Sequence, residues 1–213
     1  MKLFGYFRSS AAYRVRIALN VKGIEAEHEY VHLAKGLHTM PDYLTVNPQG
    51  LVPALVDDGH VLVQSLAIIE YLDECHPTPP LLPSDPIERA RVRALSQVVA
   101  CEIHPINNLR VLNYLTGDFG RTGDERTRWY RHWIAEGFRG LEELLVHHPG
   151  TGRYCHGDTV TMADLCLVPQ VFNARRFDCD LNAYPTLVAI ADRLNEIPAF
   201  AAAAPERQPD AEG

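Results

Sequence analysis

Two serines, Ser9 and Ser10, stand where the first helix of the chain is expected to begin. The apolar and aromatic residues of 2–7 are typical of a buried strand, and the apolar positions after Tyr13 fit a helix that ends near Gly23. The N-terminus of a helix offers unpaired backbone N–H groups and the positive end of the helix dipole, and a serine hydroxyl adds one more donor. This arrangement predicts the binding of an anion.

Serine is also a preferred N-cap of helices, so the same two residues can serve the helix alone. From this stretch by itself the cap and the anion site both stay open. The rest of the chain has to decide between them.

The composition is that of an ordinary globular protein. The chain has 213 residues, 46% of them hydrophobic and 22% charged, and its formal net charge is -7. Nucleic acids and anionic membranes are bound by basic surfaces, so the negative charge argues against both as partners. No apolar run approaches the length of a membrane span, and no signal-peptide pattern precedes the first strand, so a cytoplasmic protein is expected.

The first part of the chain predicts the order βαβ followed by ββα. After the first strand and helix, the expected elements are a strand at 26–33, a hairpin of strands at 51–56 and 61–63, and a helix opened by Gln64 and Ser65. Val52-Pro53 lies where thioredoxin-like sheets carry a cis-proline at a strand start. The N-terminal domain is therefore expected to be a thioredoxin-like α/β domain.

The proline-rich segment 76–83 cannot be helical and is predicted to be a stiff linker. Domains are therefore expected at 1–79 and 85–213. Helical periodicity runs from Asp85 to about Leu115 and suggests one long helix. Further helical segments follow at 124–147, 162–175 and 184–196. Because no later stretch alternates as a strand would, the C-terminal domain is expected to be all α.

Some local features of this second part can also be predicted. Thr161 and Asp164 have the spacing of a capping box at a helix start. Pro105 should kink the long helix in which it is expected to lie. The residues from about Pro205 to the end are expected to be loose.

The usual sequence fingerprints of nucleotide, dinucleotide, hydrolase and zinc-protease sites are absent. His28 and His32 are four residues apart in a strand-like segment without a carboxylate or cysteine at ligand spacing, so no metal site is expected. The cysteines are odd in number and lack C-x-x-C spacing, which argues against a disulfide framework and predicts reduced thiols in the core. They are Cys75, Cys101, Cys155, Cys166 and Cys179.

Four stretches together point to a known family: 6–19 with Ser9-Ser10, 47–55 with Val52-Pro53, 64–72, and 167–177. In these stretches, and along nearly its whole length, the chain resembles the zeta class of glutathione transferases, the maleylacetoacetate and maleylpyruvate isomerases. The second and third stretches are shared by many glutathione transferases, whereas the first and last together are specific to this class. The resemblance implies the glutathione transferase fold and a homodimer.

The resemblance also implies how glutathione would be bound. Ser9 would donate to the sulfur and stabilise its thiolate, and the backbone of Val52 would pair with the glutathione cysteine as an added strand. Gln64 and Ser65, at a helix start, would hold the γ-glutamyl carboxylate. His38 would supply a cation or a donor to the glycine carboxylate. In the C-terminal domain the remaining implied glutathione contacts are His104 and Asn108.

The sequence departs from the class at one place that bears on catalysis. The usual Ser-Ser-Cys-Ser is here Ser9-Ser10-Ala11-Ala12, so a cysteine and a serine sometimes credited with catalysis are missing. This difference favours Ser9 as the catalytic residue.

The resemblance implies a dianionic substrate, a maleyl diketo acid whose cis double bond is isomerised after reversible addition of the glutathione thiolate. Arg8, Arg110 and Arg176 are the implied substrate ligands, and Arg8 and Arg176 share catalysis with Ser9. The charged segment 102–110 resembles the maleylpyruvate branch. Two alternatives stay open: a transferase that conjugates glutathione to small electrophiles, and a non-catalytic glutathione-binding member of the fold.

Overall fold

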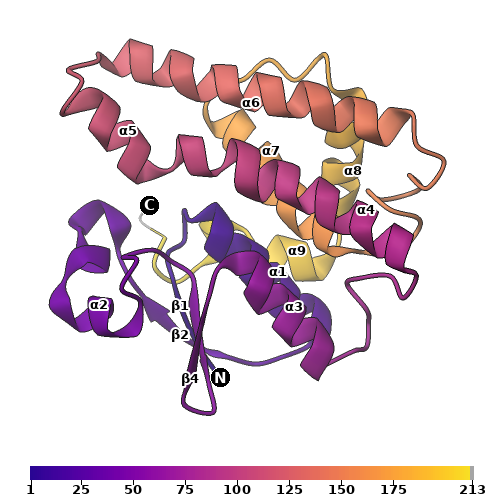
Figure 1. Ribbon diagram of the computed structural model, residues 1–213, viewed down its shortest axis with the longest axis horizontal. Coiled ribbons are helices and arrows are strands. Elements are labelled where there is room, and N and C mark those ends of the chain that lie inside the picture. Colours follow the sequence, from indigo (N-terminus) through magenta and orange to yellow (C-terminus); the bar gives the residue numbers. More distant parts are fainter. Residues whose placement is uncertain (212–213) are drawn as a thin grey trace. The chain divides into compact units, whose positions relative to one another are not determined.

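The computed structural model describes residues 1–211, and its contacts divide the chain into two units (Figure 1). The first unit is Met1–Leu82 together with the residues from Asn195 onward, and the second is Pro83–Leu194. The domain limits expected from the sequence, 1–79 and 85–213, stay a prediction. The division by contacts differs from them because the C-terminal residues associate with the first unit.

A four-stranded mixed sheet is the centre of the first unit (Figure 1). Its strands are β1 (Lys2–Gly5), β2 (Glu27–Tyr30), β3 (Ala54–Asp57) and β4 (His60–Val63), in the order β2-β1-β3-β4. β1 is parallel to β2 and antiparallel to β3, and β3 is antiparallel to β4. The βαβ-ββα order and the thioredoxin-like fold class are confirmed.

Helices α1 (Ser10–Lys22) and α3 (Ser65–Cys75) pack against each other in this unit. Between β2 and β3 the chain forms two 3-10 turns, η1 (Leu33–Lys35) and η2 (Leu37–Thr39), and the short helix α2 (Pro41–Val46). α1 ends at Gly23, whose φ of 64° is the left-handed conformation that favours glycine. The bond between Val52 and Pro53 is cis, as predicted.

A short helix near the C-terminus packs against α1. Helix α9 (Pro198–Ala203) packs on α1, and the 3-10 turn η5 (Pro205–Arg207) follows it. The amide of Asn20 donates to the carbonyl of Ala199 at 2.9 Å. The expectation of a loose segment from Pro205 is wrong for the described residues, because Pro205 is buried and the carboxylate of Asp210 accepts from the backbone N–H of Phe7 at 3.0 Å.

The second unit is helical, as predicted. Its helices are α4 (Pro86–Gln97), α5 (Leu109–Thr116), α6 (Gly123–Val146), α7 (Met162–Arg176) and α8 (Pro185–Asn195). At the start of α7 the predicted capping box is present: the carboxylate of Asp164 accepts from the backbone N–H of Thr161 at 2.7 Å. Asp164 also accepts from the N–H of Cys155 and is fully buried.

The prediction of a single long helix up to Leu115 is wrong, because the α-helix is interrupted near Pro105. A π-helical turn, η3 (Val98–Ile103), follows α4, and a 3-10 turn, η4 (Pro105–Asn107), precedes α5. Proline has no N–H and its ring clashes with the preceding turn, so a proline inside a helix kinks or interrupts it. Asn108 is then extended, with ψ at 149°. Figure 1 shows the interruption between α4 and α5.

The cysteines do not all lie in the core. Cys155 and Cys166 are buried, but Cys75 and Cys101 are exposed, so the expectation of core thiols is wrong for those two. Within the described residues no group of three or more His, Cys, Asp and Glu side chains is arranged to hold a metal ion. None of the helices in residues 1–211 combines the length and the apolar character that crossing a membrane requires.

Two glycines of α6 predict opposite effects on stability. A Cβ on Gly137 would lie 2.2 Å from Cγ1 of Ile103, which is buried in the η3 turn, whereas a Cβ on Gly140 would meet nothing within 4 Å. Overpacking costs about 1–3 kcal/mol, and alanine gains up to about 1 kcal/mol over glycine in a helix. We expect Gly137→Ala to lower the melting temperature and Gly140→Ala to leave it equal or raise it. Equal melting temperatures of the two variants would mean that Ile103 of η3 does not pack closely against Gly137 of α6.

Candidate active site

Ser9 is the N-cap of α1, and the geometry leaves its proton free for a second partner. Its backbone is extended, and its Oγ accepts from the N–H of Ala12 at 3.2 Å. A hydroxyl has one proton and two acceptor positions, so accepting this bond does not use the O–H. Capping and anion binding, which the sequence left as alternatives, are therefore compatible at Ser9.

The neighbours of Ser9 differ in what they can offer. Ser10 is the first residue of α1 and is buried, whereas Ser9 is half-buried. Arg8 is exposed, and its guanidinium lies 4.8 Å from the ring centroid of Phe7, a cation-π contact. Ser9 therefore combines a free hydroxyl proton, a helix N-terminus and an adjacent cation.

A second helix N-terminus in the same unit carries a buried cation. Ser65 begins α3 and is buried, and its Oγ accepts from Nη1 of Arg14 at 3.2 Å. Arg14 is only 2% exposed. Gln64, the residue before Ser65, has a φ of 71°, which is unusual for a residue other than glycine. Its side-chain amide donates to the side chain of Gln49 at 3.1 Å. The dipole of α3 and the charge of Arg14 both favour an anion at Ser65.

Arg14 is the residue of this site that the sequence analysis missed. It lies within the expected first helix, where the sequence analysis assigns it no role. The signal was available: Arg14 and Arg16 interrupt an otherwise apolar helix, and a buried arginine needs a specific partner.

Val52 lies just outside the hydrogen-bonded ladder of the sheet. The pairing of β3 with β1 and with β4 begins at Ala54. The carbonyl of Leu51 accepts from the hydroxyl of Tyr43 at 2.6 Å and from the amide of Asn47 at 2.7 Å, which fixes the loop before Val52. An extended peptide can pair with a backbone that is held in this way.

His38 lies in η2, and one of its ring nitrogens, Nδ1, is buried. Its Nδ1 has no hydrogen-bond partner among the described residues. Burial lowers the pKa of His38, so the imidazole is neutral at pH 7 and acts as a hydrogen-bond group and not as a cation. Gly50 packs closely behind it: a Cβ at Gly50 would lie 3.1 Å from the His38 carbonyl oxygen.

In the second unit, the interruption of the helix at Pro105 separates His104 from Asn108 and Arg110. His104 ends the π-helical turn, with its N–H donating to the carbonyl of Val99 at 3.0 Å. Asn108 is the N-cap of α5, and its Oδ1 accepts from the N–H of Arg110 at 3.2 Å. This bond gives Asn108 a structural role and leaves its amide protons for other partners. Arg110 is exposed in the first turn of α5.

Arg176 is the last residue of α7 and is supported by two aromatic rings. Its guanidinium lies 4.9 Å from the ring centroid of Phe177, and that ring stacks on Tyr130 of α6 at 3.7 Å. Burial raises the pKa of Tyr130 to about 12, so the phenol is neutral. Arg175 is engaged elsewhere, in an ion pair with Asp192 at 2.7 Å. The two adjacent arginines therefore have different surroundings, as expected for consecutive helical residues.

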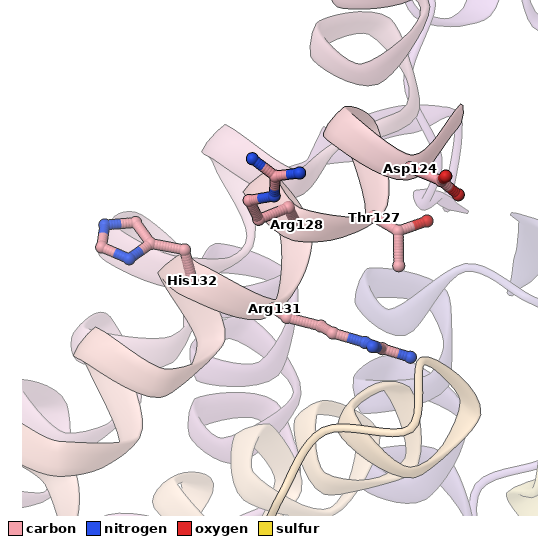
Figure 2. Close-up of a pocket in the computed structure, with 5 residues that line it drawn as sticks. All are labelled: Asp124, Thr127, Arg128, Arg131 and His132. Carbon is pink, nitrogen blue, oxygen red and sulfur yellow. The ribbon is translucent and has the colours of Figure 1, made fainter. Parts of the chain in front are cut away.

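A hollow on the surface of α6 was not predicted from the sequence (Figure 2). It is lined by Asp124, Thr127, Arg128, Arg131 and His132. Nε of Arg131 donates to the carbonyl of Phe177 at 2.6 Å. Arg131 thus holds the end of α7, next to Arg176, and it also forms an ion pair with Asp178 at 3.7 Å.

The predicted residues fall into one set in each unit. Arg8, Ser9, His38, Val52, Gln64 and Ser65 belong to the first unit, and His104, Asn108, Arg110 and Arg176 belong to the second. The first set offers donors at two helix N-termini, an imidazole nitrogen without a partner among the described residues, and the backbone of Val52 outside the sheet ladder. The second set offers two exposed guanidinium groups and an imidazole.

Family models match both parts of the chain. The model described as "Glutathione S-transferase, N-terminal domain" matches residues 1–74, and the one described as "Glutathione S-transferase, C-terminal domain" matches residues 111–203. A probable maleylacetoacetate isomerase of Vibrio cholerae is 55% identical, over 98% of this chain and 97% of its own length. The chain belongs to the glutathione transferase family.

Two solved structures place it within the family. One is the holo structure of a maleylpyruvate isomerase described as a bacterial glutathione transferase in the zeta class, with 50% identity, a TM-score of 0.98 and full coverage of both chains. The other is a maleylacetoacetate isomerase from Methylobacterium extorquens AM1 with bound malonate and glutathione, with 45% identity, a TM-score of 0.97 and full coverage of both chains. This glutathione transferase is of the zeta class.

Proposed function

We propose that this glutathione transferase is a glutathione-dependent cis-trans isomerase of a maleyl diketo acid, either maleylpyruvate or maleylacetoacetate, in the breakdown of aromatic compounds. The observation that carries the proposal is the N-terminus of α1, where the Ser9 hydroxyl proton is free and the preceding residue, Arg8, is a cation. This is where a thiolate can be kept charged.

The residues of the first unit fit glutathione chemically. Bound glutathione supplies the thiol that adds reversibly to the cis double bond. Ser9 donates to its sulfur, and Val52 pairs with its backbone. Ser65, backed by Arg14 and preceded by Gln64, takes the γ-glutamyl carboxylate, and the unpaired nitrogen of His38 suits the glycine carboxylate. His104 and Asn108 are the proposed glutathione contacts from the second unit.

Arginines are proposed to hold the dianionic substrate. A carboxylate that leaves water needs a cationic and preferably bidentate partner, which a guanidinium provides. Arg8, Arg110 and Arg176 are all exposed. The malonate bound with glutathione in the Methylobacterium relative is itself a dicarboxylate, which supports an acidic substrate here.

A thiol balance tests the proposal. We expect purified protein to isomerise maleylpyruvate or maleylacetoacetate only when glutathione is present, and to leave the concentration of free thiol unchanged during many turnovers. Ultraviolet absorbance follows the substrate, and a thiol reagent counts the glutathione. Loss of one thiol per substrate would identify a conjugating transferase, and no turnover with glutathione bound would identify a non-catalytic binding protein.

The homodimer that the class resemblance implies and the cytoplasmic location expected from the sequence stay predictions. The mass of the protein in solution, compared with 23.9 kDa for one chain, tests the first of them.

A further inference from the structure

The turn that presents Ser9 has no neighbouring strand to hold it. β1 ends at Gly5, and the turn from Tyr6 to Ser9 is closed by one bond of its own, from the N–H of Ser9 to the carbonyl of Tyr6 at 2.9 Å. Side chains bind the N–H and the carbonyl of Phe7 in this turn. The N–H of Phe7 donates to the carboxylate of Asp210 at 3.0 Å.

Asp210 lies in residues 205–211, which we call the C-terminal strap. Within and beside the strap, the amide of Gln208 donates to the carbonyls of Ala202 and Ala204, both at 3.0 Å. Ala211 packs against the apolar cluster that contains Tyr6 and Phe7. These contacts hold the carboxylate of Asp210 at a defined position beside the turn.

A buried guanidinium joins the end of α9, just before the strap, to the same turn. Arg16 is 5% exposed, and its Nε donates to the carbonyl of Ala203 at 3.1 Å. Its other nitrogens donate to the carbonyls of Tyr6 at 3.4 Å and Phe7 at 3.1 Å. Burial lowers the pKa of Arg16 to about 10, so it is still charged at neutral pH. A cation therefore holds two carbonyls of the turn and an anion holds one of its amides.

We infer that Asp210 is a positioning residue for Ser9: through the amide of Phe7 it fixes the turn that aims the Ser9 hydroxyl at the glutathione sulfur. The inference rests on the proposed function. A catalytic donor has to be held to within about 0.5 Å of its productive position, and a turn without ladder bonds does not hold a residue that well by itself. The strap supplies the missing constraint, although it lies about 200 residues further along the chain.

Three variants test this. Asp210→Ala removes the acceptor, Asp210→Asn keeps an oxygen that can accept from the Phe7 amide, and Glu206→Ala removes an exposed carboxylate of the same strap as the control. The readouts are amide hydrogen exchange at Phe7, turnover, and the pKa of bound glutathione measured from thiolate absorbance. A purely structural role would lower the melting temperature but would not move the pKa of the bound thiol in the protein that stays folded.

For Asp210→Ala we expect turnover to fall at least about fivefold and the pKa of the bound thiol to rise by roughly 0.7 of a unit, the shift that corresponds to fivefold. Exchange at Phe7 should be at least about tenfold faster than in the parent. Asp210→Asn should stay within about twofold of the parent in turnover. Glu206→Ala should match the parent in turnover, in the pKa of the bound thiol and in amide exchange at Phe7.

The inference would be overturned if Asp210→Ala kept the thiol pKa and the turnover of the parent. It would also be overturned if Asp210→Asn and Asp210→Ala lost turnover equally, because the hydrogen bond from Phe7 would then not be the cause. If Asp210→Ala does not fold, Asp210→Asn decides: fast Phe7 exchange with an unchanged thiol pKa would refute the inference, whereas intact exchange with near-parental turnover supports it. Failure of the parent itself to isomerise would instead refute the proposed function, and Phe7 exchange would still report whether Asp210 holds the turn.

Discussion

Replacing Ser9 by alanine should lower isomerase turnover at least tenfold. A charge-assisted hydrogen bond to the thiolate contributes at least about 1.4 kcal/mol, which is a factor of ten. A free thiol has a pKa of about 8.5. Lowering the pKa of bound glutathione by about two units requires about 2.7 kcal/mol from the hydroxyl, the α1 dipole and the charge of Arg8 together. Removal of the hydroxyl should therefore also raise the pKa of bound glutathione, measured from thiolate absorbance.

The N-cap role of Ser9 has to be separated from its role as a donor. Ser9→Ala loses both, because Oγ also accepts from Ala12, and loss of a cap costs about 1 kcal/mol of stability. Ser9→Gly is the matched control, since glycine caps almost as well as serine but has no hydroxyl. We expect Ser9→Gly to keep most of the stability and to lose the activity. Parental turnover in Ser9→Ala, with Ser10→Ala inactive, would assign the donor role to Ser10.

Local patterns predicted the first unit well because its elements are defined by nearby residues. The apolar run before Ser9, the left-handed Gly23 after α1 and the turn of 57–59 between β3 and β4 are all short-range signals. The N-cap could be anticipated from residue type and position. That the Ser9 hydroxyl keeps its proton free could not be anticipated, because this depends on Oγ accepting the bond from Ala12.

The second unit shows where a periodic pattern is insufficient. Apolar periodicity continues through residues 98–107, but Pro105 cannot donate in a helix, and the chain changes to π and 3-10 turns around it. The prediction of a kink understated the effect. As a result Asn108, expected only as a glutathione contact, is also the N-cap of α5.

Contacts between residues far apart in the sequence could not be predicted from local patterns. The bond from Phe7 to Asp210 joins residues at the two ends of the chain, and the C-terminal segment looked loose because it contains alanine, proline and polar residues. Arg14 was missed for a related reason: its partner, Ser65, is on another helix. A buried arginine in an apolar helix was the one signal that pointed to such contacts.

Arg176 is expected to decide whether the substrate is acidic. Arg176→Ala should raise KM for a maleyl diketo acid roughly tenfold or more, while the affinity for glutathione and the fold are kept, because one guanidinium that binds a carboxylate is lost. Arg176→Lys should fall between the parent and the alanine variant, since an ammonium keeps the charge but not the planar, bidentate geometry. Steady-state kinetics with each substrate varied in turn separate the two binding events.

Arg175→Ala is the matched control, because Arg175 is adjacent, has the same charge and is also exposed. It forms an ion pair with Asp192, and exposed pairs contribute at most about 1 kcal/mol to stability. We therefore expect a slightly lower melting temperature and a KM close to that of the parent. An equal rise of KM in both variants would indicate a general loss of positive charge at the end of α7. If neither variant changes KM, the carboxylate is bound elsewhere, and Arg110 at the start of α5 becomes the next residue to replace.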